Sequence, residues 1–177
     1  MKATGVVRRI DDLGRIVIPK EIRKNLRINN GENLEIFIDE NSNIILRKYS
    51  QIDKLKEVAS SIAEAIHLLT KKNIIITNTD KFVTISGNLK REYLDKPLSG
   101  QILKAIQDRK EIYKGEPNTI EMTDNKDEEG GFAISPIIAH GDIIGSVIIF
   151  EKKGTLEESD FQIAKIVSNF LAKHIEQ

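Results

Sequence analysis

The first fifty residues alternate between short apolar runs and polar turns, a pattern that indicates strands around one short helix. Asp11-Asp12-Leu13-Gly14 supplies turn residues between two of the apolar runs. Pro19 suits the first turn of a helix, where its missing N–H costs nothing, and we predict a helix from Lys20 to Arg27. Four strands are predicted around it, at residues 6–10, 15–18, 34–38 and 44–49.

A longer amphipathic pattern runs from Ile52 to Leu69. Its apolar positions are spaced three and four residues apart, as in the seam of a coiled coil, at Ile52, Leu55, Ala59, Ile62, Ile66 and Leu69. Ala59 and Ala63 are small enough for a partner helix to approach closely. An amphipathic helix that lies on the sheet of its own domain fits the pattern equally well, and both interpretations stay open.

Residues 73–177 mix strand and helix patterns, which predicts an α/β domain. A long hairpin is expected around His140-Gly141-Asp142, and Thr155 with Glu158 predicts a capping box at the start of the last helix. Two apolar stripes on that helix predict burial against both a sheet and a second helix. The stripes are Phe161, Ala164, Val167, Leu171 and Ile163, Ile166, Phe170. The predicted strands are 74–77, 82–85, 131–139 and 143–150, with a helix at 98–109 and an acidic loop at 115–130.

Composition narrows the class of protein. The chain has 177 residues, enough for two small domains, and no cysteine, which excludes disulfides and thiolate metal sites. No apolar run reaches the ~18 residues that cross a bilayer, and no signal-peptide pattern is present. We therefore expect a cytoplasmic protein that does not associate with a membrane.

The charge is distributed unevenly although its sum is zero. Residues 1–27 carry eight Lys and Arg against three Asp and Glu, and the rest of the chain carries the compensating negative charge. A basic segment on an acidic body is typical of a DNA-binding module attached to another domain, although chance clustering on a solvated face gives the same count.

The basic residues of this segment fall into two clusters, one on a single face of the predicted helix and one around the preceding turn. Like charges one helical turn apart destabilise an isolated helix by a few tenths of a kcal/mol per pair, a cost that an anionic partner offsets. The planar guanidinium of arginine matches phosphate oxygens and guanine edges. The predicted DNA-binding residues are Arg8, Arg9, Arg15, Lys20, Arg23, Lys24 and Arg27.

Fifty residues of this kind bury too little apolar surface to be stable alone. Because the segment has neither a cysteine nor a metal site to stabilise it, oligomerisation is the remaining remedy. We therefore expect an obligate dimer through residues 1–50.

The contiguous segment TGVVRRIDDLGRIVIPKEIRK, from Thr4 to Lys24, resembles the AbrB-type swapped-hairpin DNA-binding domain. The resemblance covers residues 1–50 and implies two interleaved chains that form one small β-barrel and bind double-stranded DNA. The basic positions that contact DNA in that family match Arg8, Arg15, Arg23 and Lys24 of this chain. With a sensor-like domain behind it, the whole arrangement resembles a family of regulators from endospore-forming bacteria, which implies activation and repression of genes late in spore formation.

Residues 136–150, PIIAHGDIIGSVIIF, resemble the GAF family of small-molecule sensor domains more weakly. The residue pattern of cyclic-nucleotide-binding members is not assembled here, and the cysteine that anchors tetrapyrroles in other members is absent. We therefore expect no cofactor. The resemblance implies an unidentified small-molecule effector or a role in oligomerisation, and a tetramer through residues 51–177 is expected.

Catalysis and metal binding have little support in the sequence. His67, His140 and His174 are far apart and lack a carboxylate at metal-ligand spacing, and Lys126 occupies a position where a calcium loop needs a ligand oxygen. No P-loop, Rossmann glycine set or nucleophile elbow is present. A ligand-binding enzyme with an incidental basic segment is thus the weaker alternative. An antitoxin that represses its own genes is the other alternative, although antitoxins usually end in a disordered tail.

Together these observations predict an α+β protein in three parts. They are a swapped-hairpin DNA-binding domain at 1–50, a linker or dimerisation helix at 51–71, and a GAF-like α/β sensor or oligomerisation domain at 72–177. The predicted function is that of a cytoplasmic, nucleoid-associated transcription regulator without enzymatic activity.

Overall fold

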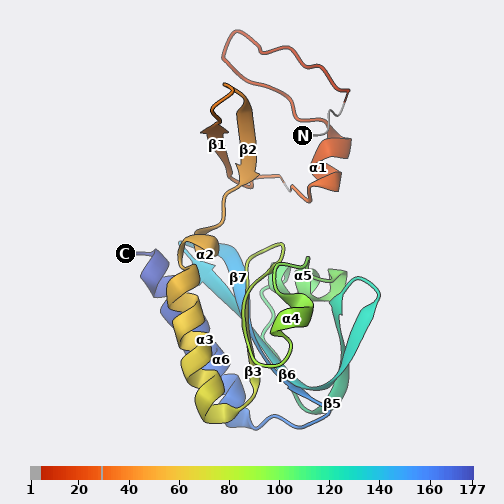
Figure 1. Ribbon diagram of the computed structural model, residues 1–177, viewed down its shortest axis with the longest axis vertical. Coiled ribbons are helices and arrows are strands. Elements are labelled where there is room, and N and C mark those ends of the chain that lie inside the picture. Colours follow the sequence, from red (N-terminus) through yellow and green to blue (C-terminus); the bar gives the residue numbers. More distant parts are fainter. Residues whose placement is uncertain (1–4, 29) are drawn as a thin grey trace. The chain divides into compact units, whose positions relative to one another are not determined.

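The computed structural model describes residues 5–28 and 30–177, so Thr4, the start of the motif above, lies outside the described residues. The chain divides into two compact units between Tyr49 and Ser50 (Figure 1). The first unit contains α1 (Lys20–Asn25), β1 (Leu34–Ile38) and β2 (Ile44–Lys48). The second contains α2 (Gln51–Lys54), α3 (Lys56–Thr70), β3 (Asn73–Thr77), β4 (Phe82–Ser86), α4 (Lys90–Tyr93), α5 (Gly100–Gln107), β5 (Ile112–Thr123), β6 (Lys126–Ala139), β7 (Asp142–Lys152) and α6 (Glu158–Ile175).

The hairpin predicted in the first unit is confirmed. β1 and β2 pair antiparallel, with Ile36 opposite Leu46. The Asp39 carboxylate organises the connecting turn, since its Oδ1 accepts hydrogen bonds from the backbone N–H groups of Asn41 (2.9 Å) and Asn43 (2.8 Å). This is the Asx-type turn for which aspartate is favoured between two strands.

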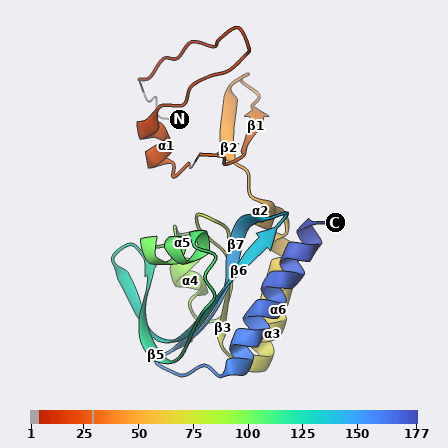
Figure 2. The ribbon, with the colours of Figure 1, turned by 180° about the vertical axis from the view of Figure 1, so that it is seen from behind.

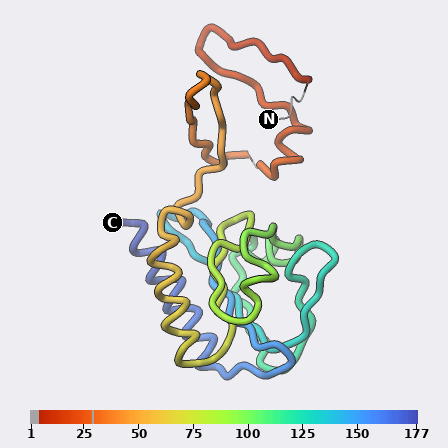
Figure 3. The backbone as a smooth tube through the Cα atoms, viewed as in Figure 1, coloured from red at the N-terminus to blue at the C-terminus, as the bar shows by residue number. Residues whose placement is uncertain are grey.

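The two strands predicted at residues 6–10 and 15–18 are absent, and that prediction is wrong for the single chain. Only the turn between them forms, with a hydrogen bond from the N–H of Asp11 to the carbonyl oxygen of Arg15 (3.0 Å). Residues 5–18 follow an open path within the first unit (Figure 3). A strand requires a ladder of hydrogen bonds with a neighbouring backbone, and residues 7–10 and 16–18 form no such ladder among the described residues.

The second unit is built on one antiparallel sheet in the order β4-β3-β7-β6-β5. In both ribbon views α3 and α6 lie side by side on one face of this sheet, and α4 and α5 lie on the opposite side (Figures 1 and 2). Each face carries its own hydrophobic core, one packed under α3 and α6 and the other under α4 and α5. Every residue of β3 is buried, as expected for a strand covered on both faces.

The apolar seam of residues 52–69 packs onto the sheet of its own unit. Ile52, Ala59 and Ala63 are fully buried and belong to the same core as Val167 of α6. The helix is interrupted at Leu55 between α2 and α3, and Leu69 at the far end is 86% exposed. Most of the seam is thus packed in this core, as expected for an amphipathic helix that lies on the sheet of its own domain.

The loop predicted at residues 115–130 is wrong, because this segment forms most of β5 and the start of β6. The two strands pair from Ile112 opposite Ile134 to Thr123 opposite Lys126, across a turn in which Asn125 has a φ of 65°. β5 is an edge strand whose polar residues remain largely exposed, so it tolerates the acidic and amide side chains that suggested a loop.

The capping box of the last helix is shifted from the predicted pair, Thr155 and Glu158. Glu157 is the N-cap, and its side chain and that of Asp160 bond reciprocally to each other's backbone N–H. Leu156 explains the shift, since its side chain is buried and its N–H donates to the carbonyl of Gly115 (2.8 Å), which keeps the chain extended beyond Thr155. Asp160 also forms a buried ion pair with Lys72.

Candidate nucleic-acid interface

The turn at residues 11–14 is organised by Asp11. Its Oδ1 accepts hydrogen bonds from the N–H groups of Leu13 (3.0 Å) and Arg15 (2.8 Å), and its carbonyl accepts from Gly14 (2.9 Å). Gly14 has a φ of 76°, a conformation that glycine adopts without steric cost. The Asp-x-x-Gly-Arg spacing therefore has a local structural reason.

Arg15 is held to this turn by its side chain as well. Its Nε donates to Oδ2 of Asp11 at 2.8 Å. The backbone N–H and then the guanidinium of Arg15 hold the pKa of the Asp11 carboxyl below its usual value. Because both side chains are largely exposed, this ion pair orients Arg15 more than it stabilises the unit.

Helix α1 begins after Pro19 and is shorter than predicted. It ends through a Schellman-type arrangement, in which the N–H of Ile28 donates to the carbonyl of Arg23 (2.8 Å) and that of Arg27 to the carbonyl of Lys24 (3.1 Å). Arg27 has a φ of 52° and lies beyond the helix. The predicted helix face of Lys20, Arg23, Lys24 and Arg27 is therefore wrong at its last member, because the helix ends at Asn25 and the chain reverses at Arg27.

Arg23 occupies a different environment from the other helical cations. It is half-buried, its Nη1 donates to Oδ1 of Asn30 at 2.6 Å, and its Nε is buried without a hydrogen-bond partner among the described residues. Lys20 and Lys24 are exposed. Sequence reasoning missed Asn30, since no pattern signals a contact that depends on how the chain turns after the helix.

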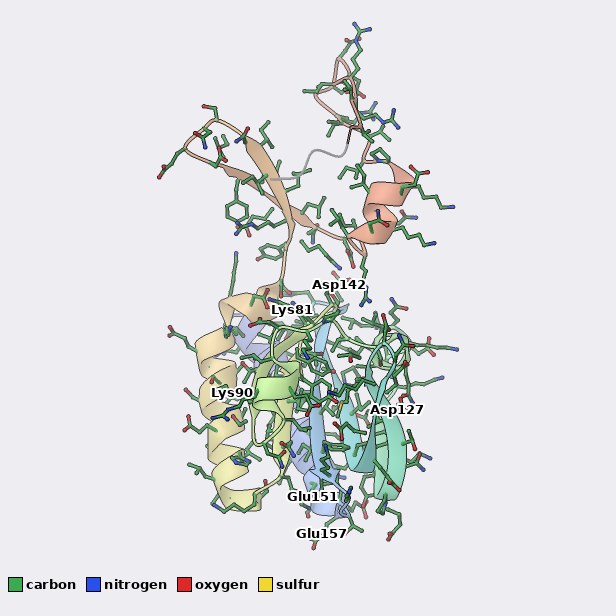
Figure 4. All side chains as sticks on the ribbon, turned by 45° about the vertical axis from the view of Figure 1, so that its right-hand side comes forward. Lys81, Lys90, Asp127, Asp142, Glu151 and Glu157 are labelled. Carbon is green, nitrogen blue, oxygen red and sulfur yellow. The ribbon has the colours of Figure 1, made fainter. Side chains whose placement is uncertain are left out.

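The structure leaves most of the predicted contact residues accessible. Five of the seven are exposed and two are half-buried (Arg23 and Arg27). Long side chains project outward from α1 and from the preceding segment (Figure 4). The exposed five are Arg8, Arg9, Arg15, Lys20 and Lys24. Such a surface can neutralise phosphates of a nucleic-acid backbone.

The same unit exposes an unusual amount of apolar surface. None of its described hydrophobic residues is buried, and the first fully buried residue in the described part of the chain is Ile52. The large apolar side chains exposed by at least a third are Val6, Val7, Ile10, Leu13, Ile16, Val17, Leu26, Ile36, Phe37, Ile38, Ile44, Leu46 and Tyr49. Apolar exposure on this scale is typical of a surface that a partner covers.

The polar groups around Tyr93 serve the structure of the second unit. Tyr93 is buried and its hydroxyl donates to Oε1 of Glu128 (2.7 Å), while Lys152 pairs with Oε2 of the same carboxylate (2.8 Å). Burial first, and then the bond to Glu128, raises the pKa of the Tyr93 hydroxyl. The neighbouring Asp127, labelled in Figure 4, is exposed. Among the described residues, no group of three His, Asp or Glu is placed to hold a metal ion.

The three histidines lie in separate structural settings. Nδ1 of His67 lies 2.7 Å from the carbonyl oxygen of Lys72, and the ring of His174 stacks on Phe170. His140 occupies the β6–β7 turn with a φ of 51°, and its N–H donates to Oε1 of Glu176 at 2.9 Å. No helix in the described part of the chain is long and apolar enough to cross a membrane.

A small basic unit followed by an antiparallel sheet layered between helices defines a DNA-binding regulator with an attached GAF-like domain. The chain matches the family described as "Stage V sporulation protein T C-terminal, transcription factor" over residues 54–176. Stage V sporulation protein T of Bacillus subtilis (strain 168) is 39% identical over 178 residues, which cover 100% of both chains. The chain belongs to the stage V sporulation protein T family of transcription factors.

The first unit has relatives of its own. Residues 7–54 match the family described as "Antidote-toxin recognition MazE, bacterial antitoxin". The transition state regulatory protein AbrB of Bacillus subtilis (strain 168) is 53% identical over 49 residues, which are 28% of this chain and 50% of AbrB. The AbrB-type DNA-binding domain predicted from the sequence is confirmed.

Solved structures resemble the second unit at low sequence identity, which bears on the fold alone. The GAF domain of PixJ from Thermosynechococcus elongatus is 9% identical, with a TM-score of 0.53 over 73% of this chain and 89% of that chain. The cofactor-binding GAF domain of the nutrient sensor CodY from Clostridium difficile is 14% identical, with a TM-score of 0.50 over 71% and 93%. The predicted GAF-like fold is confirmed, and the family confirms a transcription factor rather than an enzyme.

Proposed function

We propose that this transcription factor binds double-stranded DNA through the basic surface of its first unit and thereby activates and represses genes of spore formation. The exposed cations on α1 and around the Asp11 turn carry the proposal, because they concentrate positive charge on the first unit and Asp11 holds Arg15 to its turn. The contacts assigned are Arg8, Arg15, Arg23 and Lys24, supported by Arg9, Lys20 and Arg27. This activity places the protein on the nucleoid in the cytoplasm.

The DNA-binding form is a dimer in which the first units of two chains interleave. A single first unit buries none of its described hydrophobic residues, so it gains little from the hydrophobic effect that stabilises folded domains. Pairing of residues 7–10 and 16–18 with a second chain would give these runs a strand partner and cover the adjacent apolar side chains. The four predicted strands and their partners would then form the small β-barrel implied by the family.

No helix-turn-helix is present in the described first unit, and its only helix has six residues. We expect readout through DNA shape and flexibility more than through a long series of base contacts.

Replacement of Arg15 by glutamine tests the assigned interface. Two phosphate contacts are lost per dimer, so the affinity for a duplex that the wild-type protein selects from a random pool should fall about tenfold to a hundredfold at 0.1 M salt. Arg91→Gln is the matched control, since it removes the same charge from an exposed position of α4 in the second unit. Fluorescence anisotropy measures both affinities. Equal losses in the two variants would contradict the assignment.

Exposed apolar residues on the outer surface of α3 and α6 support a tetramer through the second unit. One apolar stripe of α6 is buried in its own core, but Ile166 and Phe170 of the other are 66% and 47% exposed. Leu68 and Leu69 of α3 are 60% and 86% exposed. Because the two helices lie side by side on one face of the sheet (Figure 2), residues 51–71 would contribute both to this interface and to the connection with the first unit.

Ile166→Asp should convert the tetramer to a dimer. A charge at the centre of an apolar interface is costly to bury, whereas the first units stay paired. Gln107→Asp is the control, because Gln107 is an exposed polar residue of α5, on the opposite side of the sheet. Light scattering coupled to size-exclusion chromatography gives the mass. A wild-type dimer, or a tetramer that survives Ile166→Asp, would contradict the proposed interface.

An antitoxin function is less well supported. The antitoxin family matches residues 7–54 alone, and the remainder of the chain is a folded unit with two hydrophobic cores instead of a disordered tail. We propose that this second unit senses a small-molecule effector and that packing changes within it alter DNA affinity.

A further inference from the structure

The second unit contains a cavity of about 160 Å³ between α5 and the β5–β6 edge of the sheet. Six of its ten lining residues are apolar, and four of these six are buried side chains of one hydrophobic core. The apolar lining is Ile102, Ala105, Ile112, Ile120, Phe132 and Ile134. A concave apolar site with few polar groups is the usual form of a small-molecule site.

An irregularity in β5 lies beside this cavity. The register with β6 is interrupted between Lys114 and Asn118, so the three residues between them leave the ladder. The carbonyl of Gly115 instead accepts the N–H of Leu156, which precedes α6. Lys114 and Asn118 flank the irregularity and both line the cavity. Bulges of this kind re-aim side chains at functional sites.

The volume limits the size of the ligand. A comparable apolar cavity of ~150 Å³ in another protein accommodates benzene. The cavity of this chain therefore has room for a compact apolar group of about six carbon atoms, and the closed sides offered by Phe132 and the isoleucines favour such a group over a polar one.

The polar residues that line the cavity determine the expected charge of the ligand. Lys114 is exposed and forms no ion pair within the described part of the chain, and no acidic residue lines the cavity. The other polar lining residues are Gln101, Asn118 and Thr119, all exposed. An ammonium group accompanied by amide and hydroxyl groups suits a carboxylate, which accepts charge-assisted hydrogen bonds.

We propose that this cavity binds a small carboxylic acid with a compact branched or aromatic apolar group of about six carbons, its carboxylate at Lys114. The proposal rests on the sensor role given above for the second unit, and it names the chemical class of the effector. Bound in this way, the acid packs between α5 and the edge strands.

Calorimetric titration of the full-length protein with 4-methylpentanoate tests the site without DNA. We expect saturable binding, about tenfold weaker in Lys114→Met, which removes the charge and keeps most of the stem. The uncharged analogue 4-methylpentanamide should bind wild type about as weakly as the acid binds Lys114→Met. Lys104→Met, an exposed lysine of α5 outside the lining, should bind the acid normally.

Ala105→Leu, which fills the cavity from α5, should abolish binding while thermal unfolding confirms that the protein is folded. Absence of binding to wild type at millimolar acid, equal affinity for acid and amide, or equal losses in the Lys114 and Lys104 variants would overturn the proposal. DNA affinity is measured separately with and without 4-methylpentanoate. Binding of the acid without any change in DNA affinity would retain the site and reject the sensor role.

Discussion

The affinity of this protein for duplex DNA is expected to fall about 10³- to 10⁵-fold when salt is raised from 50 to 200 mM. Four assigned cations from each of two chains, Arg8, Arg15, Arg23 and Lys24, would neutralise about eight phosphates and release their counterions. The logarithm of the association constant should then decrease against the logarithm of salt concentration with a slope of about −7.

Fluorescence anisotropy at several salt concentrations measures this slope. In Arg15→Gln it should become shallower by about two, because two of the phosphate contacts are lost per dimer. Arg91→Gln should leave it unchanged, since Arg91 lies in the second unit. A wild-type slope shallower than about −2 would show that the first unit is not a phosphate-binding surface.

Phe150→Ala should lower the free energy of unfolding of the second unit by about 3–5 kcal/mol. Phe150 is fully buried in β7, between β3 and β6, and belongs to the core under α4 and α5. Its ring tip would lie 3.1 Å from a Cβ placed on Gly130, so it fills the space that this glycine leaves. Truncation would therefore leave a cavity that the sheet closes only in part.

Urea unfolding, monitored by circular dichroism, measures this decrease in the free energy of unfolding. Phe150→Leu serves as the control, because it retains most of the apolar volume and should cost less than half as much. If the alanine and leucine variants were equally stable, the packing around this ring would not contribute to the stability of the unit. The loss is large against the 5–15 kcal/mol that typically stabilises a domain.

The connection between the two units continues into the start of the second one. Asn78 of the β3–β4 turn lies within hydrogen-bond reach of Ser50 Oγ (3.4 Å) and Asp53 Oδ1 (3.3 Å), and Ile52 between them is fully buried. The first residues after the DNA-binding unit are thus tied to the sheet. Any rearrangement of that sheet would therefore move α2. A coupling free energy of about 1–3 kcal/mol between this rearrangement and DNA binding would suffice for regulation.

Local sequence determined much of what was predicted correctly. The Asp11 turn, Pro19 before α1, the β1–β2 hairpin and the β6–β7 hairpin depend on side chains that bond or pack near their own position, so short-range patterns identify them. The AbrB-type motif likewise indicated the DNA-binding class, because its residues are contiguous. The assignment of the seven basic residues as DNA contacts rests on the same local pattern and stays a prediction.

Long-range contacts decided the remainder. Residues 115–130 have a loop-like composition but are strands, because β6 and the edge position of β5 supply pairing that no local pattern encodes. Asn30 meets Arg23 only after the chain reverses at Arg27, and Leu156 delays α6 by bonding to Gly115. The seam of residues 52–69 fitted two packings equally, and the sheet selected one of them. Periodicity identifies which face of an element is apolar, but only the tertiary structure decides what covers that face.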